Sequence, residues 1–176
     1  MILGQVFFCF SQIQEYKIDL ANSAITFKIS HMGVLTVKGE FQKFSGTLVF
    51  NEQELLSIKS SIVVESIHTK DNSRDATLKN EGYLDVKNYP LISFTSTDVI
   101  ITSSSKEIRG ILKIKGATKE IELPYKKIKS KNPELNFIKI STQISRKDFN
   151  LDFGPMDVLI SNNVKVELKI AFSKTK

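Results

Sequence analysis

The sequence lacks most of the features that mark cross-linked, membrane-spanning or nucleotide-binding proteins. Its 176 residues include one cysteine, Cys9, so no disulfide can form within the chain. There is no tryptophan, and no apolar segment is long enough to cross a bilayer. The glycine-rich nucleotide motifs and the GxSxG nucleophile elbow are also missing. We therefore expect no nucleotide site and no stable membrane insertion, and we find no hydrolase motif.

Metal-binding side chains are few. The two histidines are His31 and His68. His68 is followed by Asp71 and Asp75, but this spacing matches no metal motif, and no partner for His31 stands near it in the sequence. We expect no metal, no cofactor and no catalytic residue.

The charge is basic but dispersed. The net charge is +6, and many lysines stand between apolar residues, as in VKVELKI near the C-terminus. This pattern is typical of strands with one solvated face, so we expect no nucleic-acid partner. The densest basic segment, residues 125–132, is interpreted as a loop between strands.

The first ten residues carry no charge and include VFFCF. Such an apolar start, followed by a polar region, is typical of a secretory signal peptide. We interpret residues 1–14 as a truncated signal peptide and residues 15–176 as the mature domain, which would make the protein periplasmic or secreted. The alternative is that the start forms a first strand of the core.

Most of the chain alternates between apolar and polar residues, as β-strands with one buried face do. The clearest segment is residues 163–172, where Val164, Val166, Leu168 and Ile170 share one face. About eight such segments predict an all-β domain that hides its edges by closing into an antiparallel barrel or by packing as two sheets.

Residues 69–94 interrupt this alternation. Asp71 and its neighbours are good helix N-caps, and Gly82 can end a helix. We predict a short helix over residues 73–80, a turn over 83–85 and a strand from Leu91, with the helix closing one end of the barrel. In the pair Arg74-Asp75, we expect one residue to bind the barrel and the other to serve the helix start, rather than to form an acid/base pair.

Four segments follow one another along the chain: GEFQKFSG, SIHTKDNSRDATLKNEGYLDVKNYPLISFTST, IRGILKIKGATKEIELP and ISRKDFN. Together they resemble the YceI family of lipocalin-like, polyisoprenoid-binding proteins. The second segment is the most specific, because it is similar to the family pattern SI.T….RD..L….FLDV..YP.I.F.S. This sequence departs from the pattern where Thr77 replaces a histidine, Tyr16 a tryptophan and Asn150 a glycine.

The resemblance implies a lipocalin-like antiparallel barrel of about eight strands, with one short helical segment near residues 73–85. It also implies an exported protein that binds, for transport or storage, a long isoprenoid or fatty-acid-like lipid in an apolar cavity. We predict that the ligand-binding residues are Phe27, Ile29, Phe41, Phe44, Ile62, Val64, Arg74, Tyr83, Phe94, Leu112, Ile114, Ile140 and Ile144.

Two alternatives to lipid binding stay open. The predicted lining residues could simply pack a solid core, which would make the protein a ligand-free structural or stress-related barrel. The same cavity could instead hold an enzyme's small apolar substrate, with His31 as its polar residue. Arg74 and His31 are also candidates for a lipid's polar head group, and family members can pair, so a homodimer is a further possibility.

Overall fold

The computed structural model describes residues 12–128 and 135–174. Residues 1–11, which hold most of the predicted signal peptide, lie outside the described residues. The first strand begins at Ile13 and pairs there with Asn51, so the last two residues of the expected leader lie in the barrel wall.

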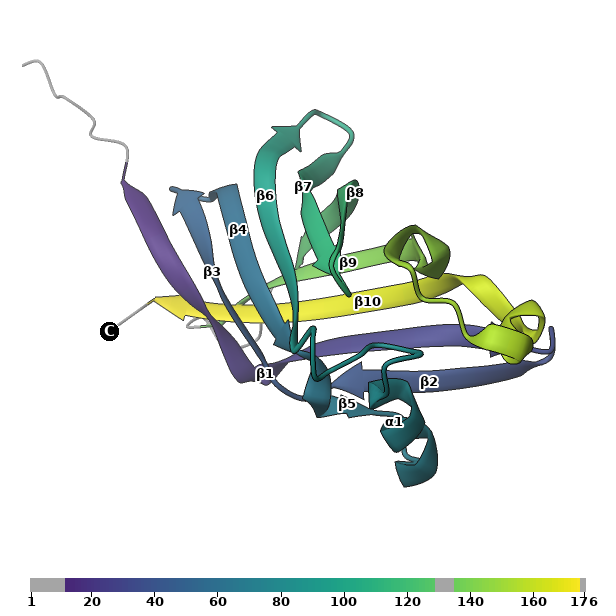
Figure 1. The fold of residues 1–176 in the computed structure, drawn as a ribbon. Coiled ribbons are helices and arrows are strands. Elements are labelled where there is room, and N and C mark those ends of the chain that lie inside the picture. The colour runs from purple at the N-terminus through teal and green to yellow at the C-terminus, as the bar shows by residue number, and fades with distance from the viewer. Residues whose placement is uncertain (1–11, 129–134, 175–176) are drawn as a thin grey trace, which may run out of the picture.

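The described part of the chain forms ten strands in one antiparallel sheet (Figure 1). Eight of these strands close into a barrel, and the other two, β2 and β5, extend the sheet from the edge of β1. The sheet order is β10-β9-β8-β7-β6-β4-β3-β1-β2-β5, and β10 also pairs with β1 to close the wall. The strands are β1 (Ile13–His31), β2 (Leu35–Phe41), β3 (Phe44–Asn51), β4 (Glu54–Val63), β5 (Ile67–His68), β6 (Leu91–Ile101), β7 (Lys106–Ile114), β8 (Ala117–Ile128), β9 (Asn136–Ser145) and β10 (Ile160–Lys174). The prediction of an antiparallel barrel is therefore confirmed.

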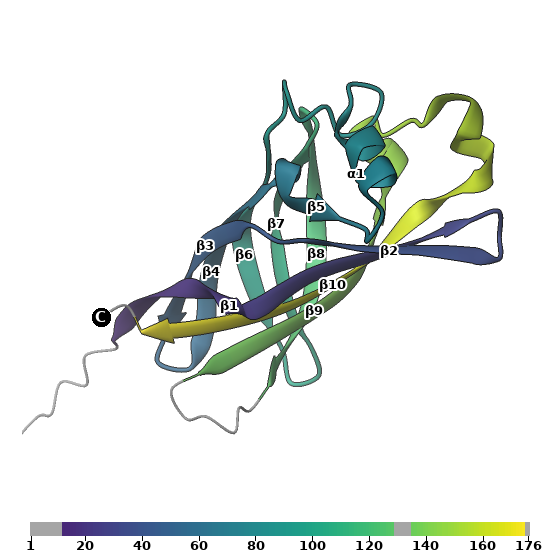
Figure 2. The ribbon, with the colours of Figure 1, turned by 90° about the horizontal axis from the view of Figure 1, so that it is seen from below.

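The long strand β1 pairs with two different strands along the same edge. Its first residues pair with β3 and its last residues, from Ile25 to His31, pair with β2. The two halves meet at an irregularity between Asp19 and Ala24, where the Ser23 hydroxyl bridges to the β10 backbone. The β1–β2 hairpin therefore reaches well past the region where β3 and β4 pair (Figure 2).

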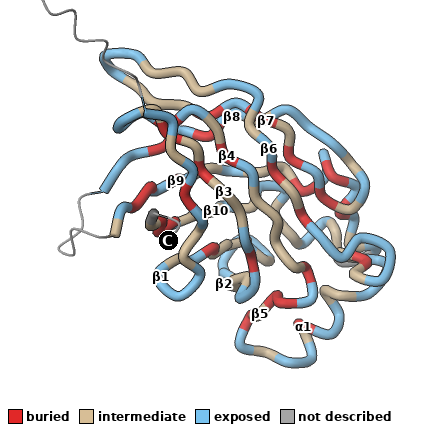
Figure 3. The backbone as a smooth tube through the Cα atoms, turned by 90° about the vertical axis from the view of Figure 1, so that its left-hand side faces the viewer, coloured by how far each residue is buried: buried red, intermediate tan, exposed pale blue. Residues whose placement is uncertain are grey.

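Burial alternates along the strands, as Figure 3 shows, and this places one face of each strand inside the barrel. At one end of the barrel the interior is solid, and we call it the packed end. Tyr16, Phe50 and Phe172 meet there, with the Phe50 and Phe172 rings stacked 4.9 Å apart and Tyr16 edge-on to both. Leu48 and Ile138, each 0% exposed, complete this core.

The other end, which we call the hollow end, carries the helical segments. These are the 3₁₀ helix η1 (Val64–Ser66), α1 (Asn72–Lys79), and the 3₁₀ helices η2 (Arg146–Phe149) and η3 (Gly154–Leu159). Figures 1 and 2 show α1 beside the β1–β2 hairpin and η3 near the hairpin's far end.

Helix α1 is close to the predicted range, and Asp71 caps it by accepting a hydrogen bond from the Arg74 backbone N–H. The prediction that Gly82 ends the helix was wrong, because the C-cap is Asn80. The last helical carbonyls accept hydrogen bonds from the turn that follows: the Leu84 N–H donates to the Leu78 carbonyl. The left-handed residue of this turn is Asp85, at φ 50°.

Two further expectations differ from the structure. Val64 was placed on the inward face of a strand, but β4 ends at Val63 and Val64 begins η1, where a 3₁₀ turn replaces the period-two alternation. The basic segment 125–132 was interpreted as a loop, but β8 continues through Ile128, and its remaining residues up to 132 lie outside the described residues.

Candidate functional site

The hollow end encloses a cavity of about 530 Å³. Residues of all ten strands, of α1 and the turn after it, and of the segment from η2 to Phe153 surround the cavity, and it is lined almost entirely by aliphatic and phenylalanine side chains. The polar exceptions among its lining residues are His31, Ser60, Arg74, Thr77, Tyr83, Thr142 and Arg146. Its volume lies within the range of small-molecule sites in proteins, about 300 to 1,000 Å³.

The structure brings all of the predicted ligand-binding residues to this cavity except Val64. Val64 is buried in the core cluster instead, because the 3₁₀ turn takes it out of the strand pattern. Arg74 and Tyr83, the two polar residues of the predicted set, both line the cavity. Whether these side chains bind a ligand stays a prediction.

Other lining residues were not in the predicted set. On β10, Val164, Val166 and Leu168 line the cavity, and the alternation of that strand already placed them inside. Phe153 and Arg146 also line it, but they lie on the η2–η3 segment, which has no alternation that could have revealed them.

Two glycines hold large rings flat against the inside of the wall. Gly39 on β2 stands in register with Phe27 on β1, and a side chain at Gly39 would overlap the Phe27 ring. Gly110 on β7 stands in register with Ser96 on β6, and a side chain at Gly110 would overlap the Phe94 ring. The absence of a Cβ therefore lets both phenylalanines lie along the wall instead of projecting across the cavity.

The polar lining residues lie mainly at the end of the cavity next to the helical segments, and we call this the polar end of the cavity. Thr77 on α1 is exposed and lines the cavity, so the cavity reaches the surface there. Among the described residues, the Nε2 atom of His31 and the Nε atom of Arg74 are buried without a hydrogen-bond partner. Arg74 uses an outer nitrogen to pair with Asp71 Oδ2 at 2.7 Å. Each of these two lining side chains therefore has a buried polar atom that no protein group satisfies.

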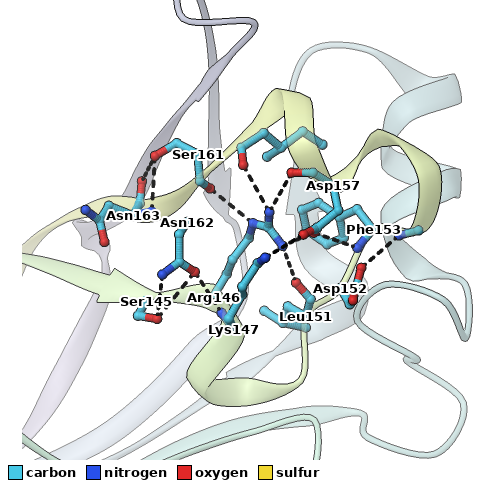
Figure 4. Close-up of polar contacts among 12 residues, drawn as sticks. Ser145, Arg146, Lys147, Leu151, Asp152, Phe153, Asp157, Ser161, Asn162 and Asn163 are labelled. Atoms are coloured by element: carbon cyan, nitrogen blue, oxygen red, sulfur yellow. Dashed lines mark hydrogen bonds and ion pairs between the residues drawn. The ribbon is translucent and has the colours of Figure 1, made fainter.

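Arg146 differs, although it also lines the cavity (Figure 4). It is 1% exposed, and its guanidinium donates to the carbonyls of Leu151, Ser161, Asp157 and Ile160 and to the Asp157 carboxylate. Since a guanidinium has five N–H groups, every donor is used. Arg146 therefore fixes the η2–η3 segment and has no donor left for a ligand.

The Asp157 carboxylate completes this network. It accepts from Arg146, from Lys147 and from the Phe153 backbone N–H. The hydrogen bond from Arg146, helped by the one from Lys147, holds the pKa of Asp157 well below its ordinary value of 3.8. Asp157 is therefore ionised across the whole neutral range. The Phe153 ring lies under the Arg146 guanidinium, 4.8 Å from it, and packs against Tyr83.

Asp75 ties α1 to the barrel. Its carboxylate accepts from the Thr69 backbone N–H at 2.8 Å and from the Thr69 hydroxyl at 2.6 Å, and it lies 3.3 Å from His68 Nδ1. Burial raises the pKa of Asp75, but these hydrogen bonds outweigh burial and leave the pKa lowered. In the pair Arg74-Asp75, Asp75 thus binds the strand segment and Arg74 serves the N-cap.

Within residues 12–128 and 135–174, no three histidine, cysteine or carboxylate side chains gather as metal ligands. None of the helices in the described ranges has the length and apolar character needed to span a bilayer.

Sequence comparison identifies the chain's relatives. The family model of the YceI-like domain matches residues 16–172. The UPF0312 protein of Pectobacterium atrosepticum is 31% identical over 163 residues, which cover 87% of this chain and 85% of that protein. Protein YceI of Escherichia coli is 31% identical over 161 residues, or 84% of each chain.

Solved structures share the fold. BcnA of Burkholderia cenocepacia superposes with a TM-score of 0.80 at 22% identity, over 88% of this chain and 98% of that one. A polyisoprenoid-binding domain from Saccharophagus degradans superposes with a TM-score of 0.70 at 15% identity, over 91% and 98%. With a family match that runs from Tyr16 to Phe172 and a barrel of the same architecture, this chain belongs to the YceI-like family.

Proposed function

We propose that the protein binds the long apolar chain of an isoprenoid or similar amphiphilic lipid in the cavity of the hollow end, and carries or stores it unchanged. The observation that carries this proposal is the cavity itself, about 530 Å³ in volume and lined almost throughout by apolar side chains. A methylene group moved from water into such a lining gains about 0.8 kcal/mol. A chain of many methylenes would therefore be held without any strong polar contact.

The family context supports the same class of ligand. The Saccharophagus degradans domain that shares this fold is described as polyisoprenoid-binding. We propose that this chain takes a ligand of that kind, in a cavity built from its own side chains.

The polar end of the cavity favours an amphiphile over a pure hydrocarbon. His31 and Arg74 line the cavity, and His31 Nε2 and Arg74 Nε are buried without a partner among the described residues. A buried polar atom without a partner costs free energy, which a hydrogen bond from a ligand would recover. We propose that the ligand's polar group forms a hydrogen bond with one of these two atoms while its apolar chain runs toward the packed end.

Binding without chemical conversion fits the side chains present. In the described part of the cavity, His31 has no carboxylate or hydroxyl partner that would make it a general base. Arg146 is fully committed to the protein.

We further propose that the protein is exported, as the apolar start of the sequence indicates.

The central test is lipid uptake by purified, delipidated full-length protein. Native mass spectrometry and titration with a polyprenol should show one lipid per cavity. Ile144→Trp fills the cavity and should weaken binding about tenfold or more, which corresponds to about 1.4 kcal/mol. Gln143→Trp is the matched control, because Gln143 is the exposed neighbour of Ile144 on β9. Equal binding by both variants, or no uptake by the wild-type protein, would refute the proposal.

The polar end can be tested separately with ligands of equal chain length. Arg74→Gln and His31→Asn should weaken binding of a polyprenyl phosphate or polyprenol, but not of the corresponding hydrocarbon. Lys79→Gln is the control on α1, because Lys79 pairs with Glu65 and does not line the cavity. If the affinities for the polar ligands and the hydrocarbon fall together, the head-group site is wrong while the apolar site stands.

A further inference from the structure

An exposed apolar surface lies at the hollow end, and we call it the apolar tip. It consists of Met32, Val34 and Leu35 in and beside the β1–β2 turn, and of Val158 and Leu159 in η3. Val34 is 85% exposed and Val158 is 89% exposed, which is unusual for such side chains. Exposed apolar side chains that cluster mark surfaces that bind a partner or a membrane.

The two segments of the apolar tip are joined to each other and to the cavity. The Met32 backbone N–H donates to the Leu159 carbonyl at 2.6 Å. The residues next to them, His31 and Ile160, stand in register across β1 and β10, and both line the cavity. The apolar tip is therefore continuous with the polar end of the cavity.

A row of lysines crosses the outer face of the barrel behind the apolar tip. Lys28 on β1 stands in register with Lys38 on β2 and with Lys165 on β10. These side chains point outward, because Phe27 and Ile29, the neighbours of Lys28, line the cavity. Lys28 also pairs with a glutamate at 3.2 Å, and no ion pair joins Lys38 or Lys165 to another described residue.

The lysine row lies close enough to the apolar tip to be attracted by a negatively charged surface in contact with the tip. Lys28 is three residues from His31, or about 10 Å along a strand. This distance is close to the Debye length at physiological ionic strength, about 8 Å, so an anionic surface at the tip would still attract the lysine row. Nearer the tip, the carboxylate of Asp157 is neutralised by Arg146 and Lys147.

We propose that the apolar tip and the lysine row together dock the hollow end on the surface of an anionic lipid bilayer. The valines of the tip enter the interfacial layer, and the lysines face the anionic head groups, as in other peripheral membrane contacts. The contact is reversible, and it brings the open end of the cavity to the surface where amphiphilic lipids reside. This inference goes beyond ligand binding in the cavity, because docking needs no occupied cavity.

The first test measures sedimentation of the full-length protein with vesicles. Vesicles of phosphatidylcholine containing roughly one quarter phosphatidylglycerol should bind the protein, and pure phosphatidylcholine should bind it about tenfold more weakly. The double substitution Val34→Asp with Val158→Asp should lower the partition coefficient about tenfold or more. Leu56→Asp is the control, because Leu56 is an exposed apolar residue on β4, away from the tip.

The second test separates the position of the lysines from the net charge. The triple substitution of Lys28, Lys38 and Lys165 by Gln should remove the preference for anionic vesicles. The chain offers a matched control in a second lysine row on β8, β9 and β10, which stands in register but lies away from the tip: Lys126, Lys139 and Lys169. Substituting that row by Gln lowers the net charge equally and should change binding less than twofold.

Three results would overturn the docking proposal. The first is no binding to anionic vesicles by the wild-type protein, and the second is an equal loss in both lysine triples. The third is a concentration-dependent dimer that Val34→Asp with Val158→Asp dissolves while vesicle binding stays unchanged, which would assign the tip to a second copy. Because Ile144→Trp blocks the cavity without altering the tip, it should leave vesicle binding intact even if lipid uptake fails.

Discussion

The two halves of the barrel use the same strands and the same alternation, yet one is solid and the other is hollow. At the packed end, Tyr16, Phe50 and Phe172 reach across the barrel and meet. At the hollow end, Phe27 and Phe94 also face inward, but glycines in the neighbouring strands let their rings lie along the wall, and about 530 Å³ stays open. The direction of the rings therefore distinguishes the two halves, because the rings meet across the barrel in one half and lie along the wall in the other.

The two halves also differ in what stabilises them. The packed end depends on apolar contacts among residues that are almost completely buried. At the hollow end, polar groups also stabilise the structure: Asp75 anchors α1, and Arg146 with Asp157 fixes the η2–η3 segment. Strand β9 runs through both halves, with Ile138 in the packed end and Ile144 at the cavity. It allows the same substitution to be compared in each.

The largest difference is expected for isoleucine-to-alanine substitutions on β9. Ile138→Ala opens a void in a filled core and should lower the free energy of unfolding by about 2 to 5 kcal/mol. Ile144 is only half-buried and borders an existing cavity, so Ile144→Ala should cost about 1 kcal/mol, because only part of the removed surface was out of water and no new void forms. Urea unfolding of the lipid-free variants measures both values. Equal losses would mean that the two halves are packed alike.

Enlarging the same two residues should give a smaller contrast. Ile138→Phe overpacks the core and should cost about 1 to 3 kcal/mol. Ile144→Phe has space to enter and should leave the free energy of unfolding nearly unchanged while weakening lipid uptake. The same unfolding measurement, combined with lipid titration, tests both variants. If Ile144→Phe proves as damaging as Ile138→Phe, the cavity is not the open space described above.

The smallest effect is expected at the polar frame, where Asp157→Asn keeps an oxygen acceptor for Arg146 but removes the charge. Because the pKa of Asp157 is lower in the folded protein, its ionisation stabilises the fold above pH 3.8. That stabilisation is lost as the pH falls from there through the folded pKa. Asp157→Asn should therefore lower stability modestly at neutral pH and flatten its decline in acid.

Thermal unfolding from pH 7 to pH 2 can follow this difference between Asp157→Asn and the wild-type protein. Asp148→Asn is the control, because Asp148 is an exposed carboxylate in η2, on the same segment. Parallel curves for Asp157→Asn and the wild-type protein would show that the ion pair does not contribute to stability.

The sequence was sufficient to predict the wall of the barrel, because alternation reports which face of a strand is buried. It placed Phe27, Ile114 and Ile144 inside, and all three line the cavity. It could not separate Ile138 from Ile144, since both alternate equally well on one strand. How far a residue lies from the aromatic cluster depends on strand register across the whole barrel, which local patterns do not contain.

Predictions were weakest where the chain leaves the strands. Gly82 was expected to end α1, but the turn after the helix satisfies the helical carbonyls, and Asp85 takes the left-handed conformation. Val64 was predicted to line the cavity, but it lies in a 3₁₀ turn instead. Nothing in the sequence around Arg146 indicated that its side chain would be buried. Asn150 departs from the family's glycine, yet it adopts φ 56°, a conformation that asparagine tolerates.

Gly39 and Gly110, which lie in the wall of the barrel, help to determine the width of the cavity. Each leaves clearance for one phenylalanine ring, so the residue that adds no atoms to the lining determines how much lumen remains. Adding a single methyl group at Gly39 would push the Phe27 ring inward and narrow the lumen without changing any residue that a ligand touches. Residues in the wall that never contact the ligand can therefore limit the size of the ligand that such a barrel accepts.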